Sequence, residues 1–93
     1  MKSDHPFTIG KAIVIRTVTM IQTGILKEVG KKELVLTDAS WIADTGRFGE
    51  FLKEGPISDS AEVEPFPDGE VFVGRGAIID AVHVEWKPSR ETK

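Results

Sequence analysis

The segment Asp38–Phe48, with the sequence DASWIADTGRF, holds the densest group of side chains suited to ligand recognition. It combines two carboxylates, an indole, a guanidinium and a phenyl ring beside a glycine that favours a turn. Aromatic rings stack on planar ligands, arginine pairs with anions, and carboxylates accept hydrogen bonds. A strand-like run at residues 33–37 precedes the segment, so we expect a rigid sheet to hold a recognition loop.

Three side chains of this segment have both a ligand-binding and a structural interpretation. Trp41 follows the expected strand end, where an aromatic ring belongs to a core as often as to a binding platform. Phe48 is better suited to packing a short helix on the sheet. Arg47 would lie in the first turn of that helix, where the macrodipole disfavours a cation unless an anion binds it. Arg47 is therefore the more informative candidate for a ligand contact.

The tripeptide Asp-Thr-Gly at residues 44–46 is also the active-site sequence of aspartic proteases. In those enzymes two copies bring two carboxylates together to share a proton. Residues 73–75 resemble the Gly-Arg sequence that supports that site in retroviral proteases, but the intervening stretch is too short for flaps. The bulky Arg47 also follows the tripeptide where a small residue is usual. We therefore interpret the tripeptide as a turn at which Thr45 caps the following helix.

Two further arginines are candidates for the same chemistry. The Gly74–Gly76 sequence resembles a phosphate-binding loop, but it leads into a β-rich run instead of a helix N-terminus. We expect a tight turn that presents Arg75 to solvent or to a ligand. Arg16 interrupts an apolar strand and, if buried, would need an acidic partner such as Asp38 or Asp80. An ion pair and a ligand contact both remain open for Arg16.

Composition excludes several classes of function. A chain of 93 residues forms one domain and hides roughly 60–65% of its unfolded surface. The absence of cysteine excludes a disulfide framework, a thiolate zinc site and a thiol nucleophile. A net charge of −3 and scattered basic residues argue against duplex nucleic acid as a partner. His5 and His83 lie far apart in sequence, so we expect no metal site, and we expect no cofactor.

The chain also lacks the sequence features of a membrane protein. No run approaches the roughly 20 apolar residues of a membrane span, and the first residues lack a signal-peptide core. We therefore expect a soluble protein with no membrane partner. The predicted organisation is a flexible arm at residues 1–9, a single β-rich domain at 10–86 and a flexible tail at 87–93.

Runs of β-branched residues bounded by glycine and proline predict a mainly β protein. The expected strands are residues 12–21, 25–29, 33–38, 70–74 and 77–84, with an edge strand or extended loop at 62–67. Bends or turns are expected at residues 22–24, 29–32, 67–69 and 74–76.

A short helix is expected at residues 47–54, where Phe48, Phe51 and Leu52 share one face before Gly55 and Pro56 end it. About five strands of this length, joined by hairpins and accompanied by one short helix, are typical of a few small β architectures. The expected fold is a small, strongly bent sheet or an SH3-like or Sm-like barrel.

Motifs spread over nearly the whole chain resemble a family of short, uncharacterised phage and prophage proteins. They are VIRTVTM at residues 14–20, TG at 23–24, ELVL at 33–36, DASWIADTGRF at 38–48, EVEPF at 62–66 and VFVGRGAI at 71–78. Their order, from an Arg-Thr strand to an aromatic segment and a short helix, is also similar to a second group of small phage proteins. Phage proteins of this size include sponges that seize cyclic nucleotides made by bacterial defence systems such as Thoeris and CBASS, without cleaving them.

The resemblance implies an anti-defence protein that sequesters a cyclic nucleotide or another nucleotide-derived signal in the cytoplasm of the infected bacterial host. It further implies a homo-oligomer in which the segment from Trp41 to Phe48 meets the ligand at a subunit boundary. A base would stack on an aromatic ring, arginines would bind phosphates, and Asp44 would accept from a base edge or a ribose hydroxyl. The expected ligand contacts are Arg16, Thr17, Thr19, Trp41, Asp44, Thr45, Arg47, Phe48 and Arg75.

Two other classes of function stay open at this stage. An Sm-like or SH3-like module that binds RNA or a host protein is supported by the expected fold class alone. An enzyme is the third class, either a nuclease or phosphodiesterase acting on the same cyclic nucleotides or the aspartic protease considered above. With 15 carboxylates the chain always offers some close pair for acid–base chemistry, but no pattern singles one out. We therefore expect no enzymatic activity.

Overall fold

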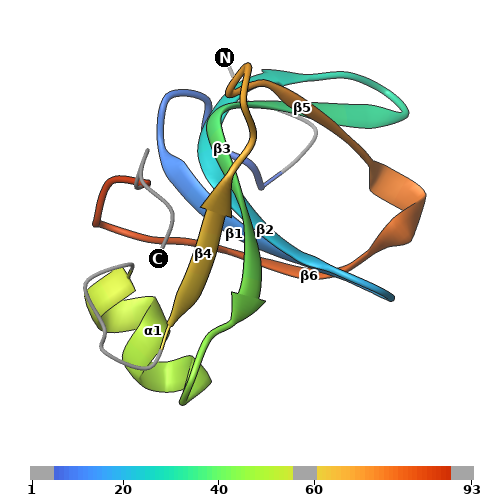
Figure 1. The fold of residues 1–93 in the computed structure, drawn as a ribbon. Coiled ribbons are helices and arrows are strands. Elements are labelled where there is room, and N and C mark those ends of the chain that lie inside the picture. The colour runs from blue at the N-terminus through green and yellow to red at the C-terminus, as the bar shows by residue number, and fades with distance from the viewer. Residues whose placement is uncertain (1–5, 56–60, 89–93) are drawn as a thin grey trace.

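Six β-strands and one short α-helix make up most of the computed structural model over the residues that it describes, 6–55 and 61–88 (Figure 1). The strands are β1 (Ala12–Thr17), β2 (Ile21–Val29), β3 (Glu33–Asp44), β4 (Glu62–Pro65), β5 (Val71–Gly74) and β6 (Ile78–His83). The helix α1 spans Phe48–Glu54, and a single 3₁₀ turn, η2 (Arg75–Ala77), separates β5 from β6. The predicted class, mainly β with one short helix, is confirmed.

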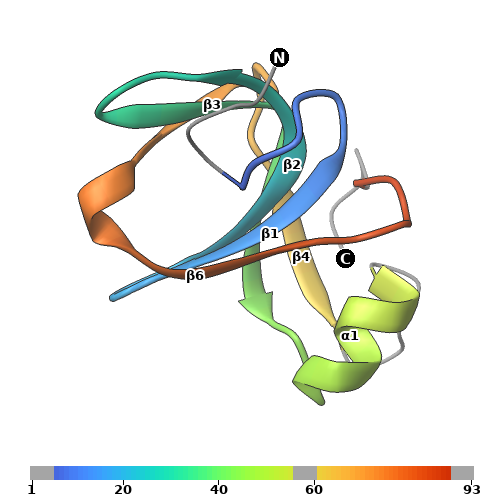
Figure 2. The same cartoon turned by 180° about the vertical axis from the view of Figure 1, so that it is seen from behind.

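The strands form one sheet in the order β4-β3-β2-β1-β6, and β5 pairs with β3 outside this path. Each pairing is antiparallel. Both β5 and β4 pair with β3, the first along residues 33–36 and the second along residues 40–44. The sheet bends strongly but does not close, so it corresponds to the bent sheet and not to a closed barrel (Figures 1 and 2).

A β-bulge interrupts the pairing of β2 with β3 at Gly24. Opposite this glycine β3 carries two residues, Asp38 and Ala39, in place of one, and Asp38 adopts a positive φ of 50°. A Cβ atom at Gly24 would lie 2.9 Å from both the Leu36 Cβ and the Thr37 carbonyl oxygen. This β-bulge therefore depends on a glycine, and it strengthens the twist of the long β3 strand. The predicted break between two strands at residues 22–24 is wrong, because these residues lie within β2 and the extra residue of the bulge is on β3.

Two hydrophobic cores lie on opposite faces of the sheet because β1 is buried on both sides. Its side chains alternate, so that Ala12 and Val14 enter one core and Ile13 and Ile15 enter the other. The first core lies between the sheet and α1 and comprises Ala12, Val14, Ile42, Phe51, Ala61, Val63 and Val84. The second is enclosed by the bent sheet and comprises Ile13, Ile15, Leu26, Leu34, Leu36, Ala39 and Val73.

The predicted long first strand at residues 12–21 is wrong, because the chain turns back after Thr17. The Thr17 amide donates to the Met20 carbonyl oxygen at 2.8 Å. The Thr17 hydroxyl also donates to that oxygen and accepts from the Met20 amide, each at 3.1 Å. Threonine favours strands, but its hydroxyl can also satisfy the backbone of a turn. Here the second property determines the outcome, and β2 begins at Ile21.

The end of β3 also differs from the expectation. We predicted a strand to residue 38 followed by a recognition loop, but β3 continues to Asp44, so Trp41 lies on a strand. The physical reason is β4, whose pairing with residues 40–44 provides hydrogen bonds that extend β3. The predicted helix is confirmed, starting at Phe48, but the predicted Thr45 cap is wrong. Arg47 is the N-cap residue, and its side chain makes no capping hydrogen bond.

Trp86 fixes α1 on the sheet. Its ring meets Phe51 edge-on at a centroid distance of 5.3 Å, and its indole N–H donates to the Leu52 carbonyl oxygen at 3.0 Å. At the C-cap Gly55 has φ of 67°, and a Cβ there would lie 2.4 Å from the Trp86 ring. Glycine is therefore required at this helix end. Within the described ranges we find no helix with the length and apolarity needed to span a membrane.

Candidate functional site

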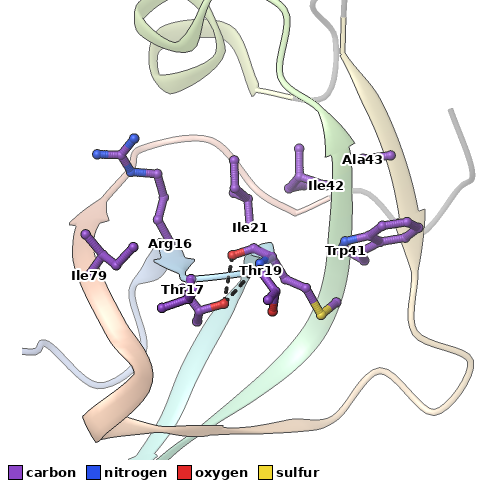
Figure 3. A pocket seen from close by; sticks show the side chains of 10 residues that line it. Arg16, Thr17, Thr19, Ile21, Trp41, Ile42, Ala43 and Ile79 are labelled. Atoms are coloured by element: carbon purple, nitrogen blue, oxygen red, sulfur yellow. Dashed lines mark hydrogen bonds between the residues drawn. The ribbon is translucent and has the colours of Figure 1, made fainter.

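A pocket of about 410 Å³ lies at the end of the sheet where the β1–β2 turn approaches the last residues of β3 (Figure 3). It contains four of the side chains predicted from the sequence: Arg16, Thr17, Thr19 and Trp41. The remaining lining residues are Val18, Met20, Ile21, Ile42, Ala43 and Ile79. Figure 3 shows Arg16 and Trp41 on opposite sides, with Ile21 and Ile42 between them. We call this the principal pocket.

Strand alternation exposes Trp41 at the edge of this pocket. Its neighbours Ser40 and Ile42 are buried, whereas 37% of Trp41 is exposed. The indole is opposite Gln22 on β2 and opposite Glu64 on β4, so backbone pairing holds its strand on both sides. A rigid, partly exposed aromatic ring is suited to stacking on a flat ligand.

Arg16 lies directly opposite Asp80 in the β1–β6 register. Its Nε donates to Oδ1 of Asp80 at 2.8 Å, and its Nη2 donates to Oδ2. The guanidinium carbon also lies 4.9 Å from the centre of the Phe48 ring. These bonds to Asp80 raise the pKa of Arg16, and the same bonds hold the pKa of Asp80 below its ordinary value.

The ion pair makes the principal pocket electrically almost neutral. Arg16 is the single ionisable side chain among the described residues that line it, and its partner neutralises it. Of the two hydroxyl groups, that of Thr17 is engaged in the β1–β2 turn. The Thr19 hydroxyl makes no hydrogen bond within residues 6–55 and 61–88, so it is available to a ligand. The pocket therefore suits the uncharged part of a ligand.

A second hollow of about 420 Å³ includes Phe48, whose ring contacts Arg16 of the principal pocket. Its lining consists of Arg47, Phe48, Gly49, Glu50 and Lys53. Arg47 and Lys53 are exposed, and neither forms an ion pair with another residue in the described part of the chain. Two predicted residues, Arg47 and Phe48, thus line this hollow, where Arg47 contributes positive charge and Phe48 contacts Arg16 of the principal pocket.

A third hollow of about 230 Å³ shares Met20 and Trp41 with the principal pocket. Its other lining residues are Glu64, Pro65, Phe66 and Pro67. We did not predict these residues as ligand contacts, because the pairing of β4 with β3 cannot be read from either segment alone. The Pro-Phe-Pro sequence after an acidic edge strand was the one available signal.

Three predicted residues lie outside these hollows. Asp44 and Thr45 form the turn between β3 and α1, where Oδ1 of Asp44 accepts from the Gly46 amide at 2.8 Å. Arg75 is near the β2–β3 turn, at the other end of β3. Its Nη1 donates to the Gly30 carbonyl oxygen at 2.8 Å, and its guanidinium carbon lies 5.6 Å from the centre of the Phe7 ring. The contacts of Arg75 are those of a structural residue.

His83 has two structural contacts. Its Nδ1 is 3.1 Å from the Ala12 carbonyl oxygen, and its Nε2 accepts from the Thr8 amide at 2.9 Å. No group of three or more His, Cys, Asp or Glu side chains in the described ranges could hold a metal ion. The side chains around Trp41 offer an aromatic face and the Thr19 hydroxyl, and the cations Arg47 and Lys53 line the second hollow. Comparison with protein-family models, curated proteins and solved structures found no match for this chain.

Proposed function

We propose that this protein is a phage anti-defence protein that binds and sequesters a cyclic nucleotide immune signal, of the Thoeris or CBASS type, without cleaving it. The principal pocket carries this proposal, because it brings Trp41 together with Arg16 and Thr19 from separate parts of the sequence. Its volume of about 410 Å³ lies within the range of roughly 300–1,000 Å³ found for small-molecule sites.

The proposed binding mode divides the ligand between the two larger hollows. A base stacks on Trp41, which contributes about 1–3 kcal/mol in comparable pairs. The Thr19 hydroxyl bonds a ribose or base atom, and the neutral, apolar wall suits these uncharged groups. Phosphates extend past the Arg16–Phe48 contact to Arg47 and Lys53, which offer charge-assisted hydrogen bonds.

Sequestration agrees with the chemistry that these side chains offer. Capture of a signal needs affinity and no bond cleavage, so stacking and charge pairing are sufficient. The motif resemblance to phage proteins supplies the biological setting, the cytoplasm of an infected host. The pocket lies open at the end of the sheet, and a homo-oligomer would supply a cover for it.

The proposal is tested by mixing the purified protein with a pool of linear and cyclic nucleotides, removing the unbound fraction, and heating the protein. The released compounds are then identified by chromatography and mass spectrometry. Recovery of an intact cyclic nucleotide supports sequestration, whereas recovery of a cleaved product would assign the protein to the phosphodiesterases. The same release from the Trp41→Ala variant should be strongly reduced. An empty trace would contradict nucleotide binding.

The second candidate is an Sm-like or SH3-like module that binds RNA or a host protein. The observation that favours it is the set of exposed apolar side chains around the pocket, with Val18 81% and Ile79 63% exposed. RNA binding would weaken steeply with salt and strengthen with oligonucleotide length. A fluorescence anisotropy titration of labelled oligonucleotides at several salt concentrations separates this function from capture of a small nucleotide.

A further inference from the structure

Glu64 on β4 and Trp41 on β3 are direct neighbours on adjacent strands. They are partners in the β3–β4 register, so their side chains project from the same face of the sheet. Residues opposite one another in an antiparallel pair have Cβ atoms about 4.5–5.5 Å apart. The third hollow lies at this pair, with Phe66 and two prolines completing its wall.

The Glu64 carboxylate is available to a ligand. It forms no ion pair or hydrogen bond within residues 6–55 and 61–88. Other carboxylates have partners there, namely Asp80 with Arg16, Glu70 with Lys27 and Glu85 with Lys11. An ionised carboxylate only accepts hydrogen bonds, and it offers two oxygens side by side. A ligand in the third hollow therefore meets aromatic and apolar walls and one carboxylate, whose two oxygens can both accept hydrogen bonds.

We propose that the third hollow is a base-recognition subsite that selects guanine. This inference rests on the proposed nucleotide binding and names the base. The purine ring packs against Trp41 and Phe66, while its N1–H and its 2-amino group donate to the two Glu64 oxygens. Adenine carries an acceptor at N1, which would face a carboxylate oxygen without a proton between them. The carboxylate consequently favours guanine over adenine.

The size of the hollow agrees with one ring system. Its volume of about 230 Å³ is below the roughly 300–1,000 Å³ of a site for a whole drug-sized ligand. Because Trp41 and Met20 line both hollows, the sugar of a nucleotide held here continues into the principal pocket. The subsite and the principal pocket would thus hold two parts of one ligand.

Isothermal titration calorimetry with cyclic di-GMP and cyclic di-AMP tests this assignment. We expect the protein to bind cyclic di-GMP about tenfold to a hundredfold more tightly, the discrimination typical of a bidentate base contact. In Glu64→Gln the amide presents a donor to the guanine edge, so this preference should be lost. Glu62→Gln is the matched control, since it removes the same charge from the same strand at a residue outside the lining of the hollow.

Other outcomes separate this inference from the proposed function. Equal affinity for the two cyclic dinucleotides overturns the guanine subsite but leaves nucleotide binding intact. Loss of the preference in Glu62→Gln as well would assign it to net charge, which also overturns the subsite. Binding of tetramethylammonium that depends on Glu64, with no binding of either cyclic dinucleotide, would assign the hollow to organic cations. Failure to bind any member of the nucleotide pool overturns both proposals.

Discussion

Arg16 and Asp80 are cross-strand partners whose paired hydrogen bonds join β1 to β6 at the mouth of the principal pocket. The pair lies beside the ring of Phe48, so it also links the sheet to the first residue of α1. It therefore has two consequences, for the stability of the sheet and for the charge of the pocket.

The first prediction concerns stability at acid pH. The folded-state pKa of Asp80 is lowered, chiefly by the hydrogen bond from Arg16, so its ionised form stabilises the fold. This contribution to stability is complete above the pKa of about 4 that the carboxyl group has in the unfolded chain. It is lost as the pH falls through the lowered pKa of the folded state. Melting temperatures should be measured from pH 7 downward. Below a pH of about 4 they should fall less steeply for Asp80→Asn than for the unmodified protein. Parallel curves would show that the pair does not stabilise the fold.

The second prediction concerns the stacking role of Trp41. Trp41→Ala should weaken nucleotide binding by about 1–3 kcal/mol, the cost of removing one base–aromatic stack. The melting temperature should change little, because the indole is 37% exposed and lies outside both cores. Phe72→Ala is the control, since Phe72 is 68% exposed and belongs to none of the three hollows. Titration calorimetry and thermal melts on both variants make the comparison.

The third prediction distinguishes two arginines that the sequence suggested for the same role. Arg47→Ala should weaken nucleotide binding and leave the melting temperature almost unchanged, because Arg47 is exposed in the second hollow. Arg75→Ala should keep nucleotide affinity but destabilise the fold by about 1 kcal/mol, since its bond to the Gly30 carbonyl oxygen is lost. The opposite pattern would place the phosphate contact at Arg75.

The fourth prediction tests the bulge. Gly24→Ala should destabilise the protein by about 1–3 kcal/mol, because its new methyl group overlaps Leu36 and the Thr37 carbonyl. Gly49→Ala is the matched substitution. A Cβ at Gly49 meets no atom within 4 Å, so helix propensity should raise stability by about 0.5–1 kcal/mol. Urea unfolding of the two variants should therefore give shifts of opposite sign.

Local signals in the sequence are sufficient to predict the helix. The spacing of Phe48, Phe51 and Leu52 with Gly55 at the end defines a short amphipathic helix, which the structure contains. Gly24 between β-branched runs predicts a break between two strands, but the structure keeps it inside β2, opposite the bulged residues of β3. The helix depends on residues close together in sequence, so it can be predicted without tertiary contacts, whereas the bulge depends on the pairing of Gly24 with β3.

Features that depend on distant pairing could not be predicted in the same way. The sequence predicts a loop at Trp41 because β4, which extends β3 past it, comes much later in the chain. Glu64 reaches the site through the same pairing, so its own segment does not indicate a site residue. The turn after Thr17 was missed because β-branched residues favour strands on average, whereas here a threonine hydroxyl closes a hairpin.

The pairing of β1 with β6 also has a kinetic consequence. Arg16 and Asp80 are separated by 64 positions in the chain, so their contact requires closure of a long loop. Proteins rich in such non-local pairings fold slowly, because the entropy cost of closing the loop is incurred before the stabilising contacts form. Since Arg16 and Ile79 both line the principal pocket, the pocket takes its final form only when β6 docks. The gain of ligand affinity during refolding should therefore follow the slowest phase of sheet assembly.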